Sequence, residues 1–92
     1  MDDIKVSIVI PVYNPGELLK GCLDSASNQT LKDIEIICID DGSVDGSLDM
    51  LNQYAKNDSR FKVFTQSNLG AGMARNKGLE YANGEYIVFF SF

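Results

Sequence analysis

Short apolar runs rich in β-branched residues alternate along this chain with stretches of helical periodicity. The apolar runs lie at residues 5–12, 34–39, 61–65 and 85–90. The first, second and fourth are apolar almost without a break, which is typical of strands buried on both faces of a parallel sheet. The run 61–65 alternates between apolar and polar residues, and we expect it to form an edge strand.

Between these runs, apolar residues recur three or four positions apart, as they do in amphipathic helices. We expect Asn14 to cap the first helix, with Pro15 at its first position. Ser43 or Asp45 is expected to cap the second helix. The third helix is expected to span residues 71–81, because a turn signal follows it.

The resulting order, βαβαβαβ, predicts a three-layer α/β fold of Rossmann-like type, since strand–helix–strand units form right-handed crossovers and a mainly parallel sheet. The chain is short enough to be one domain, residues 1–92. Ligands bind such sheets beyond the carboxyl ends of the strands. This rule selects residues 11–14, residues 40–43, the loop after Thr65 and whatever follows Phe90.

The fourth apolar run reaches the last residues of the chain. An exposed apolar strand edge promotes aggregation, so this strand is expected to be covered. Self-association of two copies through the fourth strand is one interpretation. The other, which we favour, is that the chain is a fragment whose next elements cover the strand, so that the fold over 1–92 is truncated.

Composition narrows the functional classes. The net charge of −5 argues against a general nucleic-acid binder. We find no signal peptide and no apolar stretch long enough to span a membrane. Cys22 and Cys38 form no CxxC pair and fall within apolar patterns, which indicates reduced core thiols in a cytoplasmic protein. The chain has no histidine, so its residues cannot form a His-based triad or a His–metal site.

Three stretches, 6–14, 39–47 and 68–78, read VSIVIPVYN, IDDGSVDGS and NLGAGMARNKG, and they resemble successive motifs of the family 2 glycosyltransferases. The stretch 82–87, ANGEYI, is similar to the segment that leads into the family's metal motif. The resemblance covers nearly the whole chain in the expected order. It implies a GT-A fold and an inverting enzyme that transfers sugar from a nucleoside-diphosphate sugar, with a UDP-sugar expected, to an acceptor hydroxyl in polysaccharide biosynthesis.

Tyr13 lies just past the first expected strand. Its ring could stack on a nucleotide base, or it could simply pack at the end of the strand. Pro11 cannot donate a ladder hydrogen bond and helps to end the strand. The resemblance implies that Pro11, Val12 and Tyr13 border a uracil pocket.

Asp40 and Asp41 are adjacent, so their side chains diverge and do not form an acid–base pair. One of them could accept a hydrogen bond from a base imide N–H, a group that uracil has and adenine lacks. The alternative is an ordinary turn followed by a helix cap. The resemblance gives the base contact to Asp41 and places Asp40 nearer the ribose or a helix end.

The third expected helix opens in a glycine-rich segment that begins at Asn68, which we include among the substrate-binding residues. A helix N-terminus favours an anion, but this segment lacks the lysine–serine pair of a Walker loop. Arg75 could reach the base or the diphosphate, or it could form a surface salt bridge. The resemblance implies that Arg75 and Asn76 line the site.

The resemblance also implies that the fourth strand leads into an Asp-x-Asp motif, which holds Mn²⁺ or Mg²⁺ on the donor diphosphate. Ser91 and Phe92 stand where the first acid would begin. Either the motif lies just beyond Phe92 or this chain departs from it. We expect the metal ligands and the catalytic base downstream, and donor binding without turnover by residues 1–92 alone. A non-catalytic nucleotide-binding or regulatory module, and a receiver-like or structural α/β domain, remain as alternatives.

Overall fold

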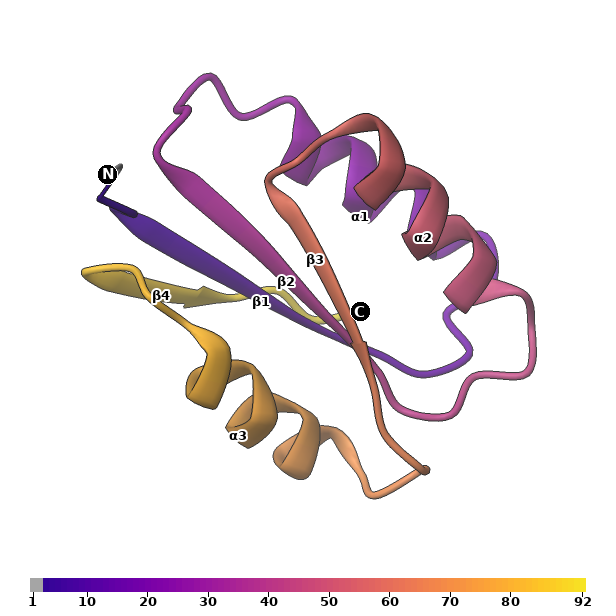
Figure 1. Cartoon of the computed structure of the whole chain (residues 1–92). Coiled ribbons are helices and arrows are strands. Elements are labelled where there is room, and N and C mark those ends of the chain that lie inside the picture. The colour runs from indigo at the N-terminus through magenta and orange to yellow at the C-terminus, as the bar shows by residue number, and fades with distance from the viewer. Residues whose placement is uncertain (1–2) are drawn as a thin grey trace.

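The structure is a computed structural model that describes residues 3–92. Its elements follow the predicted order: β1 (Val6–Val12), α1 (Leu18–Ser27), β2 (Ile34–Asp40), α2 (Ser47–Asn57), β3 (Phe61–Thr65), α3 (Ala71–Tyr81) and β4 (Tyr86–Phe89). The strands form one sheet in the order β3-β2-β1-β4, and all three pairings are parallel. Helices α1 and α2 cover one face and α3 covers the other (Figure 1). The three-layer α/β prediction is confirmed.

The two central strands carry the core, because their side chains point alternately into the two helix layers. Every residue of β2 is buried. On the face of α1 and α2 the buried side chains include Ile10, Leu19, Ile36, Leu23 and Leu51. On the face of α3 they are Val9, Ile37, Ile39 and Ala74. The predicted edge position of β3 is confirmed by the strand order.

The predicted cap of the first helix is wrong. Helix α1 begins at Leu18, and no side chain caps it. Asn14 lies four residues earlier with a positive φ of 45°. Its side-chain oxygen instead accepts a hydrogen bond from the backbone N–H of Val44, in the loop after β2. A contact between loops that are distant in the sequence thus replaces the local cap.

The caps predicted for the second helix are also wrong. Helix α2 begins at Ser47, preceded by Gly46 in the left-handed region, and no side-chain cap is present. Asp45 does accept a hydrogen bond from the N–H of Ser47 at 3.1 Å, but across two residues, as in a turn. The third helix has the bounds that the sequence predicts.

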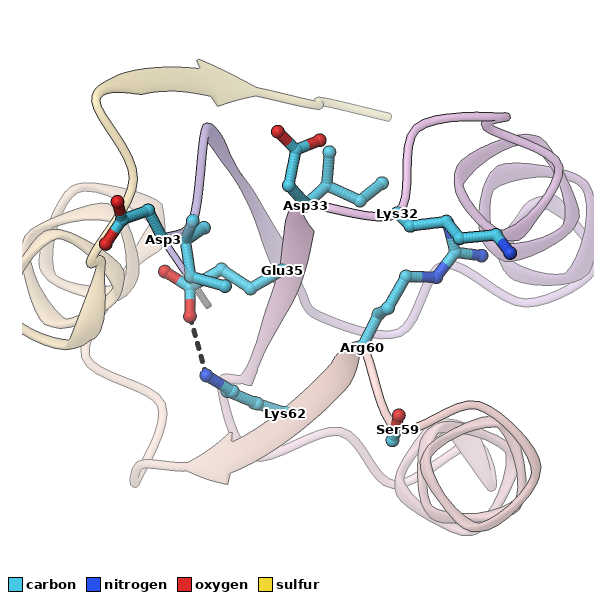
Figure 2. Close-up of a pocket in the computed structure, with 9 residues that line it drawn as sticks. Asp3, Lys32, Asp33, Glu35, Ser59, Arg60 and Lys62 are labelled. Carbon is cyan, nitrogen blue, oxygen red and sulfur yellow. Dashed lines mark hydrogen bonds and ion pairs between the residues drawn. The ribbon is translucent and has the colours of Figure 1, made fainter. Parts of the chain in front are cut away.

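A buried polar cluster ties the sheet to the α3–β4 turn. Glu35 accepts hydrogen bonds from Ser7 Oγ at 2.6 Å and from the N–H of Asn83 at 2.6 Å. It also pairs with Lys62 Nζ at 2.7 Å (Figure 2). Burial raises the pKa of the Glu35 carboxyl, but the three hydrogen bonds outweigh burial, and its pKa lies below the usual value.

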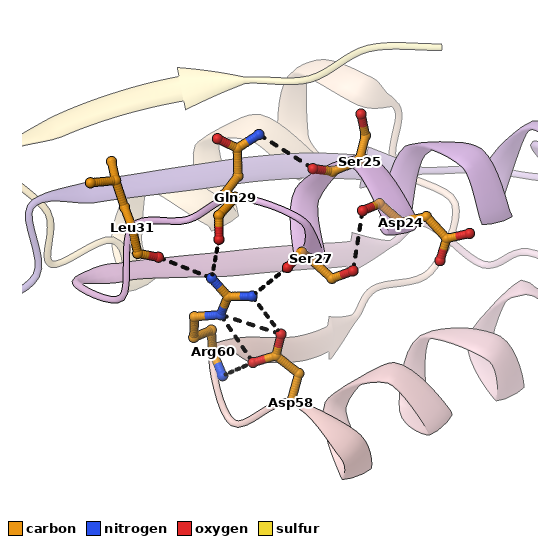
Figure 3. Close-up of polar contacts among 7 residues, drawn as sticks. All are labelled: Asp24, Ser25, Ser27, Gln29, Leu31, Asp58 and Arg60. Carbon is orange, nitrogen blue, oxygen red and sulfur yellow. Dashed lines mark hydrogen bonds and ion pairs between the residues drawn. The ribbon is translucent and has the colours of Figure 1, made fainter.

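Arg60 joins the α1–β2 connection to the α2–β3 connection at the amino ends of the strands (Figure 3). Its guanidinium donates to the backbone carbonyls of Ser27 at 2.7 Å, Gln29 at 3.2 Å and Leu31 at 3.0 Å. It also pairs with Asp58 at 2.8 Å. The α1–β2 connection is thereby held against the turn that precedes β3.

Strand β4 occupies its predicted place, but it lies at an edge, and all four of its residues are exposed. The sequence predicted a strand apolar on both faces, and in this chain neither face is covered. None of the described helices is both long enough and apolar enough to cross a membrane.

Candidate nucleotide-binding site

A cavity of about 320 Å³ lies at the carboxyl ends of the strands, beside the start of α3. This is the place that the rule for parallel sheets selects. The structure brings six of the eight predicted substrate-binding residues to its lining: Pro11, Val12, Tyr13, Asp41, Asn68 and Arg75. They come from three segments far apart in the sequence. Ser91 and Phe92, which follow β4, line the same cavity.

Tyr13 follows β1 directly and is 51% exposed. Its neighbour Val12, the last residue of β1, is fully buried and anchors the end of the strand in the core. Its half-exposed aromatic side chain lines the cavity, and each side of the ring is a flat apolar face. Such a face can stack on a base.

Asp41 is almost fully buried and already engaged. Its Oδ1 accepts hydrogen bonds from Gln66 Nε2 at 2.8 Å and from the N–H of Leu69 at 2.6 Å. Its Oδ2 accepts one from the N–H of Gly70 at 3.0 Å. Burial raises the pKa of this carboxyl, but the three hydrogen bonds outweigh burial, and its pKa lies below the usual value.

These contacts give Asp41 a role that sequence reasoning missed. The carboxylate holds the loop after β3 and the start of α3, which form one wall of the cavity. A carboxylate oxygen can accept two hydrogen bonds, and Oδ2 accepts one within residues 3–92, so it has the capacity for one more donor. No local sequence signal pairs an aspartate with backbone groups 28 and 29 residues away.

Asp40 and Asn76 do not line the cavity. Side chains alternate along β2, so Asp40 lies on the side of Cys38, which packs in the core under α1 and α2. Asp40 Oδ2 accepts a hydrogen bond from the N–H of Ser43 at 3.3 Å. Its Oδ1 is buried and has no partner within residues 3–92. Asn76 is exposed on α3.

Helix α3 begins at the cavity, and no side chain caps its N-terminus. The first-turn N–H groups of such a helix favour an anion. Arg75 is exposed, lines the cavity and forms no ion pair within the described part of the chain. The surface salt bridge considered for Arg75 is therefore not found among residues 3–92. A free guanidinium beside an open helix N-terminus suits a phosphate group.

The described residues contain no group of three or more His, Cys, Asp or Glu side chains that could hold a metal ion. Asp41 is the one carboxylate of the described chain that lines the cavity, and backbone and side-chain donors already bind both of its oxygens. The residues present therefore do not by themselves form a cation site.

A second cavity, of about 520 Å³, opens at the opposite edge of the sheet (Figure 2). It lies at the amino ends of the strands, away from the usual ligand site of a parallel sheet. Glu35 pairs there with Lys62, and Arg60 binds Asp58 and three carbonyls, whereas Asp3, Lys32 and Asp33 form no ion pair among residues 3–92. We regard this cavity as a consequence of packing.

Known proteins resemble this chain over most of its length. The model of the Glycosyl transferase family 2 matches residues 7–91. A cholesterol galactosyltransferase of Borreliella burgdorferi is 48% identical across 98% of this chain and 26% of that protein. A poly(ribitol-phosphate) beta-glucosyltransferase of Bacillus spizizenii is 51% identical across 94% of this chain and 14% of that protein. The chain thus spans about a quarter, or less, of the length of these relatives.

Solved structures show the same architecture. The crystal structure of S. aureus TarS in complex with UDP superposes with a TM-score of 0.88 at 29% identity, over 96% of this chain and 27% of that chain. The Pyrobaculum calidifontis mannosyltransferase PcManGT, in complex with GDP-Man and Mn²⁺, superposes with a TM-score of 0.86 at 24% identity, over 95% of this chain and 27% of that chain. Since the family model spans nearly all of the sequence and the fold and cavity agree with it, the chain belongs to Glycosyl transferase family 2.

Proposed function

We propose that this chain is the donor-binding part of an enzyme that transfers sugar, with inversion, from a UDP-sugar to an acceptor hydroxyl. The observation that carries the proposal is the convergence of Tyr13, Asp41 and Arg75 on one cavity at the carboxyl ends of the strands. The UDP complex of TarS, a structure of the same fold, supports the choice of nucleotide.

The cavity offers groups that suit the base of a nucleotide and groups that suit its diphosphate. The ring of Tyr13 offers a face for the base, and the remaining acceptor position of Asp41 Oδ2 suits an imide N–H. Adenine has no such N–H, so it would not form this hydrogen bond and would turn a ring-nitrogen lone pair toward the carboxylate, which disfavours it. Arg75 and the first-turn N–H groups of α3 lie in the same cavity as Asp41, and they can donate to the diphosphate or to the base.

Transfer itself needs groups that the described residues do not provide. The acceptor hydroxyl must lose a proton to a base, and the one carboxylate that lines the cavity is already bound by three donors. We propose that the divalent cation expected on the donor diphosphate is held by other residues of a longer protein. The roles proposed for the present residues are binding and orientation of the donor.

A pair of tyrosine variants tests the proposal. Tyr13 and Tyr86 are both exposed, at 51% and 62%, but Tyr86 lies on β4 outside the cavity. Stacking on an aromatic ring is worth about 1–3 kcal/mol per base. We expect Tyr13→Ala to weaken UDP binding by about 5-fold to 100-fold, measured by calorimetry, and Tyr86→Ala to leave the affinity unchanged. Equal UDP affinities for Tyr13→Ala and the unaltered chain would contradict the proposal.

A further inference from the structure

Three hydrogen bonds join the loop after β1 to the loop after β2. The N–H of Asn14 donates to Ser43 Oγ at 2.9 Å. The N–H of Val44 donates back to Asn14 Oδ1 at 2.8 Å. The N–H of Gly16 donates to Asp45 Oδ2 at 2.9 Å. We call the reciprocal pair of bonds made by Asn14 with Ser43 and Val44 the loop lock.

The backbone at Asn14 shows that the loop lock imposes a conformation. With φ at 45°, Asn14 is the one non-glycine residue in the left-handed region within residues 3–92. This region is unfavourable for most residues and is tolerated best by asparagine and aspartate after glycine. The two hydrogen bonds of the loop lock offset the unfavourable backbone conformation of Asn14. They fix the direction in which the chain leaves Tyr13, the preceding residue.

The lock has a rigid base. Ser43 is held by its own N–H, which donates to Asp40 Oδ2 at 3.3 Å. Asp40 is only 2% exposed and ends the fully buried strand β2. The adjacent N–H of Asp41 donates to the carbonyl of Val12 at 2.7 Å. Asp40, which does not reach the cavity, is thus connected to it through Ser43 and Asn14.

We infer that Asn14 and Ser43 are positioning residues for nucleotide recognition: the loop lock orders Tyr13 before the base arrives. This inference rests on the proposed function, because it assumes that Tyr13 stacks on the base. Ordering a side chain during binding reduces affinity, and a side chain ordered in advance avoids that loss. Disruption of the lock should therefore weaken UDP binding by about 3-fold to 10-fold, less than removal of the ring itself.

Fluorotyrosine labelling tests the lock without a nucleotide. The four tyrosines, at positions 13, 54, 81 and 86, give one fluorine signal each. Ser43→Ala removes the hydroxyl acceptor, whereas Ser43→Thr keeps it. Asn52→Ala, on the exposed side of α2, is the matched control. We expect Ser43→Ala to move the Tyr13 signal toward that of an unfolded chain, with the other three signals unchanged, and Ser43→Thr to restore it.

The same samples are then titrated with UDP. We expect the Kd to rise about 3-fold to 10-fold in Ser43→Ala and to stay unchanged in Asn52→Ala. An unchanged Tyr13 signal in Ser43→Ala, or an unchanged Kd despite a moved signal, would overturn the inference. If the unaltered chain fails to bind UDP while Ser43→Ala still moves the Tyr13 signal, the proposed function fails and the ordering of Tyr13 by the lock stands.

Discussion

Gly78 lies on the face of α3 that packs against β1, and we expect its replacement by alanine to destabilise the fold. A Cβ at this position would overlap with the methyl groups of Val9. Val9 cannot retreat, because it is fully buried in a strand that is paired on both sides, with β2 and with β4. The helix must therefore move away from the sheet, or Val9 must leave its rotamer.

The magnitude follows from two opposing effects. Overpacking of a filled core costs about 1–3 kcal/mol. Alanine is better than glycine inside a helix by about 0.5–1 kcal/mol. Because the overlap with Val9 is severe, the upper part of the overpacking range applies, about 2–3 kcal/mol, and after a gain of about 1 kcal/mol we expect Gly78→Ala to lower the free energy of unfolding by about 1–2 kcal/mol. At a urea dependence of about 1 kcal/mol/M, the midpoint should fall by about 1–2 M.

Gly21 provides the matched control, since it lies in α1 and a Cβ there meets no atom within 4 Å. Gly21→Ala should raise the free energy of unfolding by about 0.5–1 kcal/mol. The assay is urea unfolding of both variants, followed by far-UV circular dichroism. Equal stability of Gly78→Ala and the unaltered chain, or a shift in the same direction for both variants, would refute the reasoning.

Three further predictions concern the polar groups. Glu35→Gln should lower the free energy of unfolding by about 1–3 kcal/mol. The amide lacks the charge that pairs with Lys62, and its NH₂ group would face groups that also donate hydrogen bonds. An unchanged urea midpoint would contradict this prediction. The pKa values of Asp41 and Glu35 are lowered on folding, so their stabilisation is present at neutral pH and is lost as pH falls below about 4; urea midpoints that stay constant down to pH 3 would argue against it. Arg60→Lys should lower the free energy of unfolding by about 1–2 kcal/mol, because lysine lacks the planar guanidinium that donates to the three carbonyls. Arg75→Lys should leave the free energy of unfolding unchanged. Equal urea midpoints for the two variants would show that the guanidinium contacts of Arg60 are unimportant.

The layers of the fold were predictable from the sequence because they depend on periodicity. The run at 34–39, apolar except for Glu35, predicts burial on both faces, and β2 is buried throughout. The cavity was predictable for a related reason, since the carboxyl ends of parallel strands meet at one edge. The motifs that placed Tyr13, Asp41 and Arg75 at this edge then selected six of the residues that line it.

What the sequence did not predict depends on partners distant along the chain. Asparagine is a common helix-cap residue, but the side chain of Asn14 binds a loop 30 residues away. Arg60 carries no local signal for its partners, which are carbonyls of the α1–β2 connection. The hydrogen bonds that occupy Asp41 are equally long-range. A local pattern carries no information about such pairings until the strands are in register.

The measurement that tests the account most directly is an amide-shift titration of the ¹⁵N-labelled chain with UDP, with GDP and ADP in parallel. We expect UDP to shift the amides of Tyr13, Asp41 and Arg75 together with one common Kd, and ADP to bind more weakly. The amides of Glu35 and Arg60, at the opposite edge of the sheet, should not move. No response at millimolar UDP, or shifts concentrated at the opposite edge, would contradict a nucleotide pocket at the carboxyl ends of the strands.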